Sequence, residues 1–492
     1  LLQLRGYRRA GWSGRVSGSV TLGGILDAMS VRRAEGSARL DIVAETGGLP
    51  VRGAIGLTFD QELGLVEFSE SRLEAGVSRI QFDGGLERGI HVNLESHDLN
   101  DLLPAIALVR DSPAARLPVT LRNGVARFEG TIRGRLPEPR IEGRVSLPYF
   151  LFEGRWFDKL TAEVSASADS VRASQIALRR DDALIRGSAS VKLNRWALED
   201  SGDLGGSLTI ERIAIEDMLP GSPVRGVLTG TVRLAGTLGS PEASCRLAAS
   251  KPAVGDLHLD RAQADFRINT DSVEISSALL EAGPGRITGK GEFSHPRGDW
   301  NNGSARASFS GSRIPLARLR ALIGLPENLE GTVEFDAAGE ARVRDSKPQV
   351  VSLEGSTLLR QVLLDRKPLG ELKLSAKTER GALHLQAGGE LAGASIAGWS
   401  TWGLEEGYPA QGELRFTRMS LAALRPWWSP ASGGGESPLE VFAEGKAVFS
   451  GRGLDPKAWS ASLELPLLEV TPRKNRPAAA AFHLRNHGPV VL

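Results

Sequence analysis

Cysteine, aromatic residues and long apolar runs are all scarce in this chain, and each scarcity excludes a class of protein. Cys245 is the only cysteine in 492 residues, so the segment can form no intrachain disulfide and no cysteine-based zinc cluster. No apolar run approaches the roughly 18 residues of a membrane-spanning helix, and the N-terminal sequence lacks the apolar core of a signal peptide. Aromatic residues make up only 5% of the chain, which leaves little bulky material for large conventional cores.

Net charge and catalytic motifs are missing as well. The 60 Lys and Arg residues balance 59 Asp and Glu residues, which gives no electrostatic argument for a nucleic-acid partner. Among seven scattered histidines, His91 and His97 with Asp98 and Asp101 come closest to a metal site, but exposed polar residues at a strand end explain them better. No nucleophile elbow, Walker A sequence or dinucleotide fingerprint occurs. We therefore expect no enzyme, no catalytic residue, no metal and no cofactor.

Glycine is abundant, and it marks an internal repeat. The segment GVLTGTVRLAGTLGSPEASCRL, from residue 226, matches GVARFEGTIRGRLPEPRIEGRV, from residue 124, and looser copies begin at residues 328 and 439. The equivalent glycines are Gly130, Gly230, Gly331 and Gly445, which are 100, 101 and 114 residues apart. A unit of roughly 100 residues therefore recurs about four times. The expected division is a partial repeat at 1–98, full repeats at 99–214, 215–315 and 316–420, and a partial repeat at 421–492.

Each copy contains a strand in which apolar and polar residues alternate. In the second copy, Leu228, Val232 and Leu234 share one face with glycines, while threonines and arginines occupy the other. Such alternation is typical of an antiparallel sheet with one solvated face. Glycines on the dry face favour strong curvature or the close approach of another body. The residues expected to line an apolar groove are Phe128, Ile132, Leu228, Val232, Leu234, Val333, Phe335, Val441 and Phe449.

Each unit also carries one short apolar stretch spaced by threes and fours, which predicts one short helix per repeat. These stretches lie near residues 99–106, 215–219, 316–323 and 421–424, and a proline within or after each one limits its length. A strand every 10–12 residues predicts about 40 strands in all. With so little helix, the sheet must fold on itself as a sandwich, a solenoid or a curved trough.

The repeat resembles the AsmA-like and TamB-like proteins of Gram-negative envelopes. The resemblance rests on a glycine-rich strand, a proline turn and a returning strand, as in GTVRLAGTLGSPEASCRL and GTIRGRLPEPRIEGRV. It implies an all-β, elongated tandem-repeat antiparallel sheet, curled into a U-shaped, taco-like apolar groove that is continuous along the chain. It also implies a periplasmic protein anchored at the inner membrane. Family members are connected with carrying phospholipid to the outer membrane and, for TamB, with assembling outer-membrane proteins.

Three hypotheses about function follow. The first is a non-enzymatic lipid bridge between the inner and outer membranes, with acyl chains along the groove. The second is a scaffold that assembles outer-membrane or secreted proteins by strand-edge pairing, together with an outer-membrane assembly protein. The third is a closed solenoid or sandwich that serves as an adhesin. The chain begins at Leu1 and ends inside an apolar run, so we expect a fragment of a longer protein whose anchor lies outside it. Trp427 and Trp428 are expected to pack against a short helix, to close the groove rim or to touch a membrane interface.

Overall fold

The protein is all-β, with 78% strand and 4% helix. The computed structural model describes residues 11–27, 30–60, 65–85, 87–104, 116–134, 138–218, 223–255, 257–323, 325, 327–405, 407–420, 439–453, 458–472 and 483–491. Within these ranges, 30 strands belong to one open, antiparallel sheet. The exception to antiparallel pairing is a short parallel contact, in which Trp12 and Ser13 pair with Leu49 and Pro50. Because the sheet is open, a closed solenoid is excluded.

The chain forms two compact units, and residues 1–214 with 228–245 make up the first. Successive strands in it pair antiparallel, except that β7 pairs with β9 and β6 with β8. Its strands are β1 (Trp12–Asp27), β2 (Ser30–Ala44), β3 (Leu49–Asp60), β4 (Leu65–Ala75), β5 (Ser78–Gly85), β6 (Gly89–Ser96), β7 (Val119–Leu121), β8 (Ala126–Arg133), β9 (Arg140–Phe152), β10 (Arg155–Ser167), β11 (Ser170–Arg180), β12 (Ala183–Lys192) and β13 (Leu204–Ala214).

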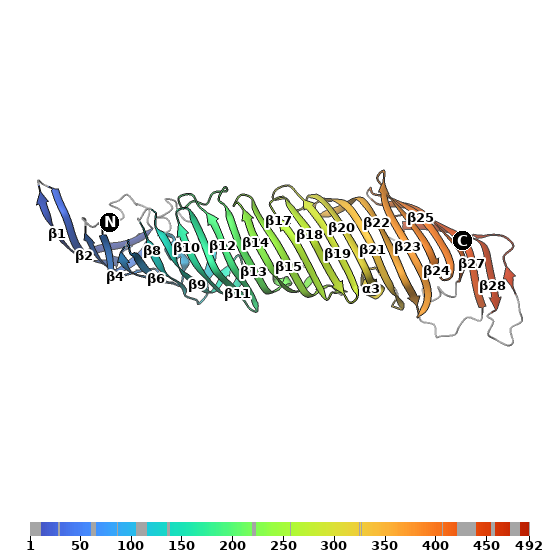
Figure 1. Cartoon of the computed structure of the whole chain (residues 1–492), viewed down its shortest axis with the longest axis horizontal. Helices are drawn as coiled ribbons and strands as arrows, with labels where there is room; N and C mark the ends of the chain where they lie inside the picture. The colour runs from blue at the N-terminus through green and yellow to red at the C-terminus, as the bar shows by residue number, and fades with distance from the viewer. Residues whose placement is uncertain are drawn as a thin grey trace. The chain divides into compact units, whose positions relative to one another are not determined.

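Residues 215–227 and 246–492 make up the second unit, while β14 (Val224–Gly236) and β15 (Pro241–Val254) contribute residues to both. Each strand from β17 to β28 pairs antiparallel with the next one in sequence, as Figure 1 shows for β17 to β25. The strands are β16 (Leu257–His258), β17 (Arg261–Ile268), β18 (Ser272–Ala282), β19 (Gly285–Ser294), β20 (Gly303–Pro315), β21 (Leu329–Arg344), β22 (Lys347–Leu364), β23 (Lys367–Glu379), β24 (Ala382–Leu391), β25 (Ala394–Gly403), β26 (Pro409–Ser420), β27 (Leu439–Arg452), β28 (Trp459–Pro472), β29 (Leu484–Arg485) and β30 (Val490–Val491).

The strands are fewer and longer than the sequence predicts. The expected number of about 40 assumed one strand every 10–12 residues, whereas β21 has 16 residues and β22 has 18. The pairing of β21 with β22 continues through two irregularities in register, at Glu330/Thr332 and at Glu340/Ala341, and shorter strands show the same behaviour. Strand β11 slips against β12 between Ala173 and Ile176, and β18 slips against β19 between Ile275 and Ala278, 102 residues further on. Bulges of this kind bend a strand and increase its twist.

Short helices form at three of the four positions that the apolar spacing predicts. They are the 3₁₀ turn η2 (Leu99–Leu102) and the α-helices α2 (Ile215–Met218) and α3 (Leu316–Ile323). The fourth position, near residue 421, lies outside the described residues, as do Trp427 and Trp428. Helix α3 follows β20 directly and packs against β21 (Figure 1).

Two apolar clusters form the core of the second unit. The first gathers around α3 and consists of Ile314, Leu316, Leu329, Val333, Val362, Leu364 and Leu369. The second consists of Ala392, Ala394, Ile396, Phe416, Met419, Ala443 and Leu465. Both clusters draw mainly on the end of the sheet at which β22 turns into β23 and β24 turns into β25. Most side chains near the middle of the strands are half-buried or exposed, whereas Ser400 and Leu465 are buried.

Candidate functional site

The strands of the second unit place their apolar residues in register, one strand after another. The pairing joins Ala278 on β18 to Gly289 on β19 and continues without a break to Ala461 on β28. We call this line of residues the central row, and the sheet face that carries it the apolar face. Its members in order are Ala278, Gly289, Phe309, Ala337, Gly355, Ala376, Leu385, Ser400, Gly412, Phe449 and Ala461.

A second line on the same face carries larger side chains. It lies two residues along each strand from the central row, a distance of about 7 Å at ordinary strand rise. From β18 to β23 it contains Leu280, Ile287, Gly311, Phe335, Thr357 and Leu374. Over the same strands, Phe309 is the one central-row side chain larger than a methyl group. Apart from Phe309, the central row over these strands is therefore a strip of glycine and alanine, and it lies beside a line in which leucine, isoleucine and phenylalanine predominate.

Glycines on this face accommodate aromatic rings from neighbouring positions. A methyl group placed on Gly311 would lie 2.4 Å from the ring of Phe335, which belongs to the adjacent strand. The same arrangement holds at Gly289, where the ring of Phe309 would be 2.6 Å away, and at Gly412, where the ring of Phe449 would be 2.5 Å away. Aromatic rings over cross-strand glycines are a known device for fixing register in sheets. These glycines thus serve the sheet itself, beyond the curvature that the sequence suggested.

Helix α3 covers part of the apolar face. Val333 is only 6% exposed and lies in the cluster that α3 completes, so it is not available to a ligand in this structure. Phe335 is half-buried at the border of the same cluster. Beyond the helix, Phe309 is 48% exposed and Leu374 is 38% exposed. The open part of the face therefore lies over the middle of β20 to β23.

The remaining predicted groove residues lie half-buried on the apolar sides of their strands. In β14, Leu228, Val232 and Leu234 alternate with exposed neighbours along the whole strand. Phe128 on β8 stands between Leu94 and Val145, and its ring covers paired glycines. Ile132 on β8 lies opposite Ile90 and Ile141, while Val441 and Phe449 share one face of β27, where Val441 lies opposite Val470.

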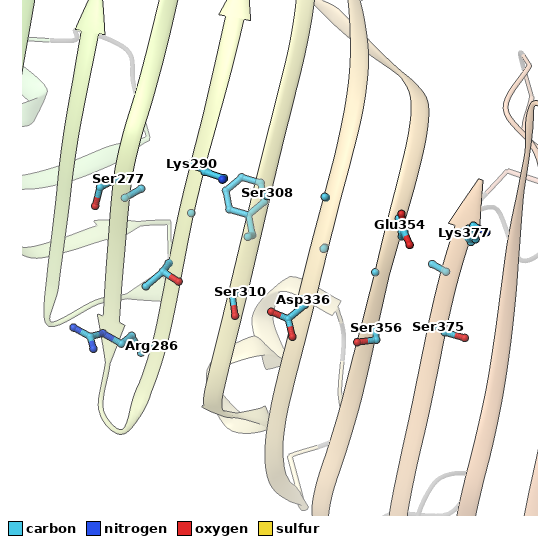
Figure 2. A pocket seen from close by; sticks show the side chains of 18 of the residues that line it. Ser277, Arg286, Lys290, Ser308, Ser310, Asp336, Glu354, Ser356, Ser375 and Lys377 are labelled. Atoms are coloured by element: carbon cyan, nitrogen blue, oxygen red, sulfur yellow. The ribbon is translucent and has the colours of Figure 1, made fainter. Parts of the chain in front are cut away.

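The opposite face of the second unit is polar and hollowed. An open hollow of about 1280 Å³ lies over β18 to β24. Ser310, Asp336, Ser356 and Ser375 are cross-strand neighbours that line it, and Figure 2 shows them in one line across four strands. A parallel line contains Lys290, Ser308, Glu354 and Lys377 (Figure 2). The hollow arises because short hydroxyl side chains stand between longer charged ones.

Ion pairs between strands neutralise the polar face. Arg306 on β20 lies 2.7 Å from Glu340 on β21, and Arg127 on β8 lies 3.0 Å from Glu95 on β6. At the hollow, the hydrogen bond from Lys377 to Glu379 raises the pKa of Lys377 and lowers the pKa of Glu379, so both groups stay charged at neutral pH. Exposed pairs of this kind contribute about 0–1 kcal/mol each.

The histidine cluster noted in the sequence does not come together. His91 and His97 lie at opposite ends of β6, and His91 faces Thr131 on the polar side. Asp101 is 8% exposed and accepts hydrogen bonds from the Val77 backbone at 2.8 Å and from the Ser78 hydroxyl at 2.9 Å. It thereby fixes the η2 turn to β5. No group of three His, Cys, Asp or Glu side chains among the described residues is arranged to hold a metal ion.

Three exposed or half-buried residues of the apolar face, Phe309, Leu353 and Leu374, were missed by sequence reasoning. They lie outside the glycine-rich strands that define the repeat, so aligning the copies did not reveal them. A sequence signal exists at Leu374, because Leu372, Leu374 and Ala376 alternate with Lys373 and Ser375 along β23. Phe309 has no such sequence signal, because its place in the central row follows only from the register between strands.

Comparison with known proteins returns no family model and no curated protein that matches this chain. Among the described residues, no helix combines the length and the apolar character needed to cross a membrane. Any assignment of function therefore rests on the two faces of the sheet.

Proposed function

We propose that this chain binds phospholipid acyl chains along its apolar face and conducts them, without covalent chemistry, between the inner and outer membranes of a Gram-negative-type envelope. The observation that carries the proposal is the central row, which is in register across eleven strands from β18 to β28 and is apolar on every one of them except β25, where it contains Ser400. A flexible acyl chain requires such a surface, since it gains free energy in proportion to the apolar area it covers. The resemblance to AsmA-like and TamB-like repeats supports the same reading and a periplasmic location.

Several further features support an acyl chain over a folded protein partner. The small side chains that make up most of the row offer no pockets for specific side chains, and binding to such an apolar strip depends little on the sequence or headgroup of the ligand. Exposed Phe309 and Leu374 add apolar area where α3 does not reach. The charged residues of the opposite face remain in water. We propose that headgroups stay near the rim of the sheet, while the two acyl chains lie across the strands.

The test compares lipid content in two triple variants. One carries Phe309→Glu, Leu353→Glu and Leu374→Glu on the apolar face, and its matched control carries Ser308→Glu, Ser352→Glu and Lys373→Glu on the polar face of the same strands. Phospholipid bound per chain, measured by extraction and mass spectrometry, should fall strongly in the first variant, because each carboxylate costs about 2.5–3.5 kcal/mol in an apolar acyl environment. The control should retain the wild-type amount. Equal lipid content in the two variants would refute lipid binding at this face.

A scaffold that assembles outer-membrane or secreted proteins remains the alternative proposal. Its work would depend on backbone groups at strand edges, which pair with an incoming strand. The apolar-face triple variant leaves those backbone groups intact. Client assembly that persists in this variant, together with unchanged lipid content, would favour the scaffold over the conduit.

A further inference from the structure

A buried histidine lies at one end of strand β19. His295 is 6% exposed, and its ring centroid lies 4.0 Å from that of Trp300 and 5.5 Å from that of Phe293. Its Nδ1 lies 2.9 Å from the carbonyl oxygen of Pro296, so Nδ1 carries the hydrogen and donates it. Its Nε2 is buried and has no hydrogen-bond partner among the described residues. A neutral imidazole fits this site, because its bare nitrogen needs no acceptor.

The loop that follows His295, residues 295–302, is closed by a carboxylate. Asp299 accepts a hydrogen bond from the backbone of Asn301 at 3.0 Å and one from the side chain of Asn302 at 2.8 Å. These bonds lower the pKa of Asp299, the side-chain bond from Asn302 having the largest effect. Asp299 therefore stays ionised throughout the pH range in which histidine titrates.

The closed loop holds a neighbouring turn. The backbone of Ser346, between β21 and β22, donates to the carbonyl oxygen of Asn301 at 2.9 Å, and the backbone of Asp345 donates to the side chain of Asn302 at 3.2 Å. The loop thereby joins the hairpin of β19 and β20 to the hairpin of β21 and β22. If the loop opens, this connection is lost.

We infer that His295 is a pH-sensitive latch, whose protonation opens the loop 295–302 and releases the turn at Asp345 and Ser346. A protonated ring has an N–H at Nε2, and a buried cationic donor without an acceptor is strongly unfavourable. Within the loop the one carboxylate is Asp299, which is already engaged by Asn301 and Asn302. Either Asp299 leaves these partners or Trp300 moves to admit water, and both changes open the loop. The charged residues of the loop and of the turns bonded to it are Asp271, Arg297, Asp299 and Asp345.

Asp299 cannot account for the same response. Because its pKa is lowered in the folded state, it contributes stability above its ordinary pKa of about 3.9, and this contribution is lost only as pH falls through the lower folded value. Histidine ordinarily changes charge between about pH 5 and pH 8. A change in protection between about pH 7.5 and pH 5.5 therefore does not come from Asp299.

The first unit contains a natural control for this loop. The backbone of Leu193 donates to the carbonyl oxygen of Asp169 at 2.7 Å, just as the backbone of His295 donates to that of Asp271 at 2.8 Å, 102 residues further on. Leucine thus stands where the second unit has histidine. A loop with leucine at this position has no histidine to protonate. Hydrogen exchange in segment 193–203 should therefore not respond to the same change in pH.

The experiment is hydrogen exchange followed by mass spectrometry on the whole chain, at about pH 7.5 and about pH 5.5, with rates divided by the intrinsic rate at each pH. Exchange in segment 295–302 should rise about tenfold at the lower pH, because opening of the loop exposes its backbone N–H groups to water. Exchange in segment 193–203 should stay unchanged. His295→Leu, and His295→Met as a second variant, should abolish the response in segment 295–302.

Two results would overturn the inference: unchanged protection of segment 295–302 in the wild-type chain at both pH values, or an equal rise in the wild-type chain and in both variants. Protection of strands β23 and β24 in each sample reports that the second unit is still folded. This inference is independent of lipid binding, because its readout is the backbone of one loop.

Discussion

Replacing Ala376 with tryptophan is expected to stop phospholipid transfer while phospholipid binding largely persists. Ala376 lies in the central row on β23, between Gly355 on β22 and Leu385 on β24. An indole at this position would stand across a strip that otherwise holds methyl groups and hydrogens. Acyl chains would still cover the face on either side of the ring, but they could no longer slide past it. The rate of fluorescent phospholipid transfer between donor and acceptor vesicles should fall to the background rate.

The matched control is Ser375→Trp, one residue earlier on the same strand. Ser375 points to the polar face and lines the hollow there, and it is half-buried like Ala376. Both variants add the same ring to the same strand, so any loss of stability affects both. Transfer should be normal in Ser375→Trp. The conduit would be ruled out by equal slowing in both variants, or by normal transfer in Ala376→Trp.

Replacing Gly311 with alanine is expected to destabilise the second unit by about 1–3 kcal/mol, the usual cost of overpacking. The added methyl group would lie 2.4 Å from the Phe335 ring and 2.7 Å from the Ile314 side chain, so the ring must move away from its position over Gly311. The loss of stability is measured by chemical denaturation, and hydrogen exchange in β20 and β21 shows whether it lies in these strands. Combining Gly311→Ala with Phe335→Leu should recover part of it, because the two changes share one contact.

Gly388→Ala provides the comparison for this substitution. A methyl group at Gly388 would meet no atom closer than 3.9 Å, so the stability should change by less than about 0.5 kcal/mol. A similar loss of stability in Gly388→Ala and Gly311→Ala, or full additivity of Gly311→Ala and Phe335→Leu, would mean that the contact between Gly311 and the Phe335 ring has no role in stability. The glycines of the apolar face would then have to be explained by curvature alone.

Much of the fold could be predicted because it depends on local pattern. The alternation of Leu228, Val232 and Leu234 with polar neighbours reappears directly as alternating exposure along β14. Apolar spacing likewise located the helices that begin at Leu99, Ile215 and Leu316. In each case, residues a few positions apart determine the outcome, so a single sequence contains the necessary information.

The composition of the site could not be predicted in the same way, because bulges change which residues share a face. Ile275 and Ala278 are three residues apart, yet they lie opposite Gly291 and Gly289, which both belong to one face of β19. Strict alternation would place them on opposite faces. The burial of Val333 depends on where α3 docks, a tertiary contact with no signature in the strand itself. The polar hollow also needs register, since its serines come from separate strands.

Photocrosslinking along β23 is the most direct test of the apolar face as a lipid path. A photoreactive residue is placed in turn at each position from Leu372 to Lys377, and phospholipid adducts are measured by mass spectrometry. The proposal predicts a period of two, with adducts at Leu372, Leu374 and Ala376 and none at Lys373, Ser375 and Lys377. Uniform labelling along the strand, or adducts confined to the polar positions, would contradict it.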